Sequence, residues 1–143
     1  MAKGIYQLLI YLPKTVSITI GKKGKFKFPK GYYIYTGSAH NGLEKRIERH
    51  LGKNKKRFWH IDYLLDYASI EKVFLYTNGK FDECDLNLET LKRPGAKIIM
   101  PKFGSSDCSC PAHLVFFEKM PKKGLIHGSR FISRQNCLID DKE

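Results

Sequence analysis

The feature that most limits the fold of this chain is an almost uninterrupted apolar run from Gly4 to Leu12. If this run is a β-strand, the even positions from Tyr6 to Leu12 place large apolar or aromatic side chains on one side of the pleat, and positions 5, 9 and 11 do so on the other. A strand that is apolar on both sides has to be covered on both faces. The sequence therefore predicts a central strand inside a layered fold.

The rest of the chain alternates between strand-like and helix-like patterns. Strands are predicted at residues 15–20, 26–28, 32–37, 71–77, 97–100 and 113–119, and helices at residues 42–51, 59–68 and 82–92. We expect residues 15–20 to form an antiparallel hairpin with the first strand. The predicted fold class is α/β, of the α+β type, with a small central sheet that is mainly antiparallel and is flanked by helices.

The length of the chain limits the number of domains, and its net charge indicates the kind of molecule that it binds. With 143 residues, the chain is long enough for one domain and too short for two ordinary ones. We expect a single domain over residues 1–143, with a core at about 4–118 and a basic segment at 119–143. Lys and Arg number 26 against 14 Asp and Glu, so the formal net charge is +12. This excess is typical of a protein that binds a polyanion.

Nothing in the pattern predicts membrane insertion or export. The longest purely apolar run, residues 8–12, is far shorter than the roughly 20 residues that cross a bilayer. The N-terminus shows no leader pattern, so we expect a cytoplasmic protein. Cysteines stand at positions 84, 108, 110 and 137. In a reducing compartment they are expected as thiols or metal ligands rather than as disulfides.

Two tripeptides, Gly4-Ile5-Tyr6 and Tyr35-Thr36-Gly37, lie in the predicted strands. They resemble the two motifs after which the GIY-YIG nuclease superfamily is named. The order of the segments that follow agrees with this resemblance. The predicted helix at 42–51 carries Arg46, with His50 one turn later, and the helix at 82–92 carries Glu83 near its start.

Within that superfamily, the chain is most similar to the branch of uncharacterised Uri-type endonucleases. The similarity lies in the strings Arg-His-Leu at 49–51, Trp-His-Ile-Asp-Tyr-Leu at 59–64, and the segment 103–114. It implies a nuclease-like core with an inserted β-hairpin. It also implies a metal-dependent endonuclease that hydrolyses DNA phosphodiester bonds, and a role in DNA repair is our further expectation. The chain departs from better-known relatives at Gly104, where the family core usually ends in asparagine.

The resemblance implies catalytic roles for Tyr6, Tyr35, Arg46, His50 and Glu83. Glu83 would bind Mg²⁺ or Mn²⁺, and Arg46 would hold the phosphate with its planar guanidinium group. One tyrosine would act as the base, although a phenol has an ordinary pKa near 10, and the sequence leaves open which one. Each of these residues could instead have a purely structural role, because tyrosine favours strands and an acidic residue stabilises a helix N-terminus.

Basic residues are gathered in several short segments. Lysine and arginine contacts to phosphate dominate non-specific affinity for nucleic acids and position the backbone without reading its sequence. A soluble charged surface is the structural alternative. The residues that we expect to bind nucleic acid, DNA rather than RNA, are Lys22, Lys23, Lys25, Arg49, Lys55, Lys56, Arg57 and His60.

A second group of residues, made of cysteines and a histidine, could bind a different metal. Cys108, Cys110 and His113 have a short spacing that suits zinc, and Cys84 from the third predicted helix could complete the site. Buried cysteines without a metal are the common alternative. Two other functions therefore stand beside the endonuclease. One is a nucleic-acid-binding domain without catalysis, and the other is an interaction module stabilised by zinc.

Overall fold

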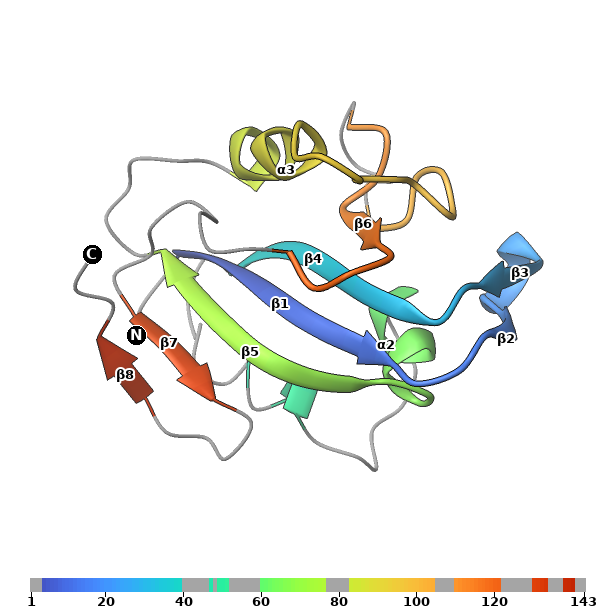
Figure 1. Cartoon of the computed structure of the whole chain (residues 1–143), viewed down its shortest axis with the longest axis horizontal. Coiled ribbons are helices and arrows are strands. Elements are labelled where there is room, and N and C mark those ends of the chain that lie inside the picture. Colours follow the sequence, from blue (N-terminus) through green and yellow to red (C-terminus); the bar gives the residue numbers. More distant parts are fainter. Residues whose placement is uncertain are drawn as a thin grey trace.

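The computed structural model describes residues 4–39, 47, 49–51, 60–76, 83–104, 110–121, 130–133 and 138–140. Most of the described strands join one six-stranded sheet, in the order β6-β4-β1-β5-β7-β8, and every pair in it is antiparallel (Figure 1). The strands of this sheet are β1 (Gly4–Leu12), β4 (Gly31–Ala39), β5 (Ser69–Tyr76), β6 (Leu114–Phe117), β7 (Arg130–Ser133) and β8 (Leu138–Asp140).

The apolar strand β1 lies in the middle of the sheet, as its sequence predicts. Its even positions, from Tyr6 to Leu12, belong to the main core, whereas Ile5 and Leu9 belong to two smaller clusters on the opposite face. The predicted fold class is therefore confirmed: the protein is a small α+β structure with a mainly antiparallel sheet.

Helices cover both faces of the sheet (Figure 1). Helix α2 (His60–Leu65) packs against the main core through Ile61 and Leu64. Residues 47 and 49–51 are also helical, and Ile47 joins the same core. Helix α3 (Glu83–Leu91) lies on the other face, where Leu86 packs with Ile5. The two faces therefore present different sets of polar residues.

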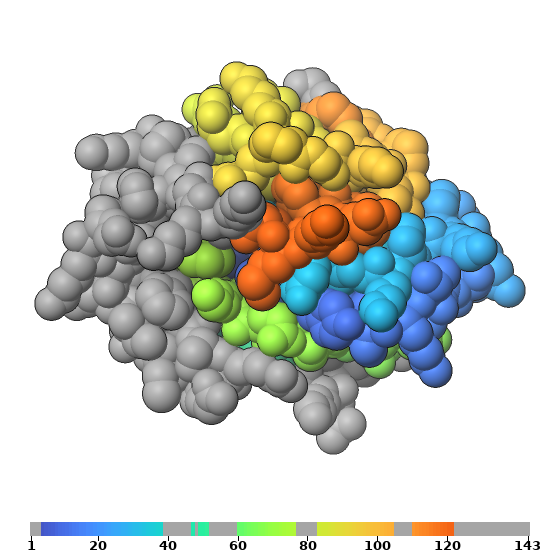
Figure 2. All heavy atoms as spheres, viewed as in Figure 1, coloured from blue at the N-terminus to red at the C-terminus, as the bar shows by residue number. Residues whose placement is uncertain are grey.

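The expectation that residues 15–20 pair with the first strand is wrong. Strand β2 (Val16–Thr19) pairs instead with β3 (Lys25–Phe28), and the two form a separate two-stranded sheet around the 3₁₀ turn η1 (Gly21–Lys23). The physical reason is that β4 and β5 already occupy both edges of β1. Strands β2 and β3 thus form a hairpin of their own, and its β3 end projects at one end of the molecule (Figure 2).

Three other expectations differ from the structure or fall outside it. Residues 97–100 form no strand, only a single bridge between Lys97 and Phe116. Strands β7 and β8 extend the sheet in a stretch whose sequence is weakly patterned. Much of the helix predicted at 42–51 lies outside the described residues.

None of the helices in the described part of the chain has the length and apolar character needed to span a bilayer.

Candidate active site and metal-ligand cluster

A buried hydrogen bond joins strand β1 to the helical residues 49–51. The hydroxyl of Tyr6 lies 2.7 Å from Nε2 of His50, and the two side chains are 1% and 2% exposed. Tyr6 points into the main core because its neighbours of the same parity, Leu8 and Ile10, do so. Two residues that are 44 positions apart are thus held in contact by the packing of a helical segment on the sheet.

Gly37 explains how the Tyr6 ring fits. The two residues face each other in the β1–β4 register, and a Cβ atom at position 37 would lie 2.5 Å from both Cζ and the hydroxyl oxygen of Tyr6. Real Cβ atoms do not approach other atoms so closely. Glycine is therefore required at the end of Tyr35-Thr36-Gly37 because the phenol of the first tripeptide occupies the space of its side chain.

Tyr35 completes an aromatic group on the same face. Its ring centroid lies 6.3 Å from that of Tyr6 and 6.2 Å from that of His50. Next to Tyr35 is Gly104, whose φ of +71° is unfavourable for other residues and whose added Cβ would lie 3.0 Å from a Tyr35 ring carbon. Glycine at this position therefore has a local conformational reason.

Thr36 points to the opposite face and joins a buried polar network under α3. Gln7 Nε2 donates to Thr36 Oγ1 at 3.0 Å and to Thr90 Oγ1 at 2.8 Å, while the Tyr76 hydroxyl donates to Gln7 Oε1 at 3.2 Å. All four side chains are buried. This network fixes which way β4 faces, so Tyr35 and Gly37 are on the side of His50 whereas Ser38 is on the side of α3.

Glu83 lies on the α3 side. Ser38 Oγ donates to Glu83 Oε1 at 2.6 Å, and His113 Nδ1 lies 2.7 Å from Glu83 Oε2. The structure therefore brings Tyr6, Tyr35 and His50 together on one face and places Glu83 on the other. The sequence reasoning missed Ser38, although its position directly after Gly37 is a signal that could have indicated it.

The two groups come closest at the edge of β4. Gly37 lies under Tyr6 and the next residue, Ser38, binds Glu83. Strand β6 pairs with β4 only as far as Tyr35, so no described strand covers positions 37 and 38 on that side. Among the described residues, this edge of β4 is therefore where the side chains of the two groups stand on consecutive positions of one strand.

Glu83 can serve as a ligand for a hard divalent cation. Its side chain is 27% exposed, so solvent reaches it. Mg²⁺ takes few protein carboxylates and keeps several waters, so one part-exposed carboxylate is a fitting donor set for this ion. Glu83 is therefore the residue that would hold Mg²⁺ or Mn²⁺, with Ser38 and His113 orienting its two oxygens.

Arg49 makes a two-pronged ion pair with Asp62. Its two terminal nitrogens lie 2.9 and 3.0 Å from the two carboxylate oxygens, and Asp62 is completely buried. A guanidinium group that pairs with a buried carboxylate in this geometry is well ordered. Arg49, which we predicted to bind nucleic acid, thus also ties the helical residues 49–51 to α2.

His60 connects the aromatic group to the basic turn. Its Nδ1 accepts a hydrogen bond of 3.0 Å from the backbone N–H of Gly104, which in turn touches Tyr35. Burial lowers the pKa of His60 below 6.5, and the positive charge of Lys23 lowers this pKa further. Lys22, Lys23 and Lys25 are all exposed. His60 is therefore hydrogen-bonded to Gly104 beside Tyr35 and lies within the electrostatic influence of the basic β2–β3 turn.

The lowered pKa predicts how stability depends on pH. Unfolded His60 binds a proton near pH 6.5 and the folded protein binds it only at lower pH, so the unfolded state holds more protons between these values. This contribution to stability is complete above about pH 6.5 and is lost as the pH falls through the folded pKa. We expect His60→Gln to flatten the fall in unfolding free energy between about pH 8 and about pH 5, measured by urea denaturation. Equal slopes for the two proteins would contradict this.

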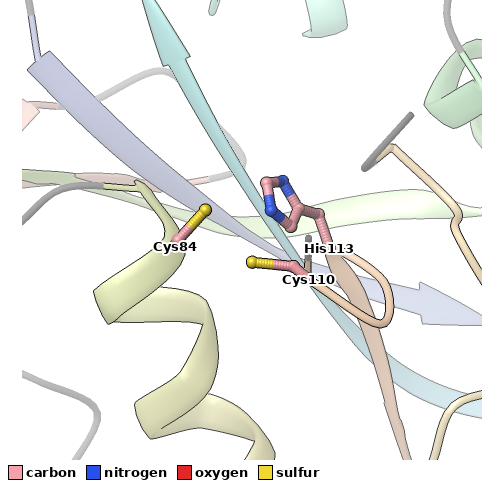
Figure 3. Close-up of side chains that lie close together, drawn as sticks. All are labelled: Cys84, Cys110 and His113. Carbon is pink, nitrogen blue, oxygen red and sulfur yellow. The ribbon is translucent and has the colours of Figure 1, made fainter. Parts of the chain in front are cut away.

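Cys84, Cys110 and His113 form a cluster on the α3 side. One ligand atom from each lies within 4.8 Å of the others, and Figure 3 shows the thiol of Cys84 on α3 directed toward Cys110 and His113 in the segment before β6. The two thiols are not joined to each other by a disulfide.

Five predicted site residues lie outside the described residues, and one of them, Cys108, is among the four predicted zinc ligands. The five are Arg46, Lys55, Lys56, Arg57 and Cys108.

Comparison with known proteins identifies the family. The family model described as a domain of unknown function, DUF123, matches residues 5–130. The match covers most of the chain, including Ile5 and Tyr6 of the first tripeptide, all of the second tripeptide and the cysteine–histidine cluster. The chain belongs to this family. No curated protein and no solved structure matches it.

Proposed function

We propose that this protein is a metal-dependent endonuclease that hydrolyses phosphodiester bonds in DNA, of the GIY-YIG type that its motifs resemble. The observation that carries the proposal is the 2.7 Å contact between the Tyr6 hydroxyl and His50 Nε2, flanked by Tyr35. A phenol next to an imidazole is a pair of groups that can pass a proton. General acid–base catalysis requires such a pair within hydrogen-bond distance.

His50 resolves a difficulty in the chemistry of the tyrosine. A phenol with an ordinary pKa near 10 is a poor base at neutral pH. When Nε2 of His50 is unprotonated, it accepts the Tyr6 proton while the phenolic oxygen takes a proton from the attacking water. The proton then resides on the imidazole, and the tyrosine is neutral again after the transfer. Tyr6 is therefore the tyrosine to which we assign the role of base, with Tyr35 beside it positioning the phosphate.

Two further groups would deal with the negative charge of the phosphate. Arg46 would hold the phosphate through paired hydrogen bonds from its guanidinium group. Glu83, oriented by Ser38 and His113, would hold Mg²⁺ or Mn²⁺, which supplies Lewis-acid charge when bound. Because Glu83 and Tyr6 lie on opposite faces, the scissile phosphate would sit at the β4 edge by Gly37 and Ser38.

The exposed lysines support DNA as the partner. Lys22, Lys23 and Lys25 stand on the β2–β3 hairpin, and the charge of Lys23 acts on His60, which is hydrogen-bonded to Gly104 beside Tyr35. The positive charge of these lysines would attract a phosphate backbone to this side of the protein. The part in DNA repair and the cytoplasmic location that the sequence predicts belong to the same proposal.

A cleavage assay tests the function. Wild-type protein is incubated with end-labelled branched, nicked and duplex DNA in the presence of Mg²⁺ or Mn²⁺, and binding is measured in parallel at several salt concentrations. We expect metal-dependent cleavage of at least one substrate, lost in Arg46→Ala and Glu83→Gln, and binding that weakens with salt. If the wild type binds every substrate and cuts none, the protein is a binding domain and the endonuclease proposal is wrong.

A further inference from the structure

The cluster on the α3 side combines residues from two separate parts of the chain. Cys84 belongs to the first turn of α3, whereas Cys110 and His113 lie in the segment that leads into β6. Their ligand atoms are all within 4.8 Å of one another (Figure 3). Cys110 and His113 are 4% and 2% exposed, so water has little access to the ligand atoms of these two residues.

The dimensions and the chemistry of the cluster fit one particular class of ion. A tetrahedral ion with metal–sulfur bonds of about 2.3 Å separates its sulfur ligands by about 3.8 Å. The three atoms therefore need to close by about 1 Å at most, which small side-chain rotations provide. Two thiolates and an imidazole select zinc over Mg²⁺, Ca²⁺ or Mn²⁺, which prefer oxygen ligands.

The surroundings of the cluster resemble the outer shell of a metal site. The carboxylate of Glu83 contacts Nδ1 of His113 at 2.7 Å, and metal-binding histidines usually have a carboxylate or carbonyl on the nitrogen that does not bind the ion. Asn87, one turn after Cys84, is fully buried and donates through Nδ2 to the carbonyl of Ala112 at 2.6 Å. Among the described residues, its Oδ1 has no hydrogen-bond partner.

We propose that Cys84, Cys110 and His113 bind one Zn²⁺ ion, with His113 coordinating through Nε2 and with Glu83 on Nδ1. Three protein ligands leave the fourth tetrahedral position of the ion for a further ligand. The ion would fasten the first turn of α3 to the segment before β6. It would thereby fix the position of Glu83, which is the neighbour of one ligand and the contact of another. This zinc site stands on its own contacts and does not depend on the endonuclease proposal.

Metal analysis tests the site directly. Protein purified without chelator is expected to contain about one zinc ion per chain, and Cys84→Ser and His113→Asn are expected to lose it. Cys137→Ser and His60→Gln are the matched controls, since each removes a residue of the same type and no proposed ligand. Removing zinc with a chelator is expected to lower the melting temperature, because an ion that binds only the folded state stabilises it.

Cobalt provides a second measurement that needs no variant. Wild-type apoprotein titrated with Co²⁺ is expected to show thiolate-to-metal charge transfer and the intense visible bands of tetrahedral coordination, and Zn²⁺ should abolish both. Wild-type protein that contains no zinc and gives no cobalt spectrum overturns the site. So does zinc that is retained in both ligand variants.

Glu83→Gln separates the zinc site from the proposed function. Glu83 is not a zinc ligand, so this variant should keep its zinc with an affinity lowered by about 10- to 100-fold, as expected for loss of an outer partner. It should nevertheless lose DNA cleavage. Stoichiometric zinc in a wild type that cuts no DNA supports the site and removes the endonuclease. Metal-dependent cleavage by a wild-type protein that binds no zinc supports the endonuclease and removes the zinc site.

Discussion

Tyr6→Phe is expected to slow DNA cleavage by a factor of about 10²–10⁴, because it removes the hydroxyl that we assign as the proton acceptor. The ring stays, so its packing on Gly37 and against Tyr35 is preserved. The cost in unfolding free energy is expected to be about 1–3 kcal/mol, since buried His50 Nε2 loses its contact with the hydroxyl. Single-turnover cleavage at saturating protein gives the rate, and urea denaturation gives the stability.

The control for this variant is Tyr11→Phe on the same strand. Tyr11 faces Tyr32 at the other end of β1 and takes no part in the site. Its loss of a hydroxyl should leave cleavage within about twofold of wild type, because the chemical step does not involve it. A Tyr6→Phe protein that is folded, binds DNA and cuts at the wild-type rate would show that Tyr6 is not the base.

Gly37→Ala is expected to disrupt the same site without replacing a catalytic residue. The new Cβ would fall 2.5 Å from Cζ and the hydroxyl oxygen of Tyr6, and the strand pairing leaves the backbone little room to move. The ring must therefore turn away, which breaks its contact with His50. Overpacking of this kind costs about 1–3 kcal/mol of stability. We expect cleavage to fall about as far as in Tyr6→Phe, and urea denaturation together with the cleavage rate measures both effects.

A double-mutant cycle makes this test specific. In a Tyr6→Leu background, the ring that meets the new Cβ is absent, so Gly37→Ala should cost less there than in the wild type. A coupling of at least about 1 kcal/mol is expected between the two positions. If the two substitutions prove additive, the glycine is needed for some other reason and the steric explanation is wrong.

The main elements of the fold could be predicted because they depend on local patterns. The apolar run of β1, the strands β4 and β5, and the helices α2 and α3 are marked by side-chain periodicity within the element itself. The pairing of β2 could not be predicted in the same way, because which strand pairs with which depends on the edges that remain open. The short strands β7 and β8 carry too few residues to show a clear pattern.

For the candidate site, the sequence indicated residue types, whereas the tertiary structure decided their partners. Spacing and motif order marked Tyr6, Tyr35, His50 and Glu83. The contact of Tyr6 with His50, the pairing of Arg49 with Asp62, and the engagement of Glu83 by Ser38 and His113 are apparent only in the folded chain.

The physical reason lies in the geometry of a strand. The residue sequence by itself determined that β1 is buried on both faces, because alternation along a strand is a local property. Which face each functional group reaches depends on the register of β1 with β4 and on the helix that covers that face. A single step along β4, from Gly37 to Ser38, separates the tyrosine face from the Glu83 and cysteine face, and only the tertiary structure fixes what lies across from each.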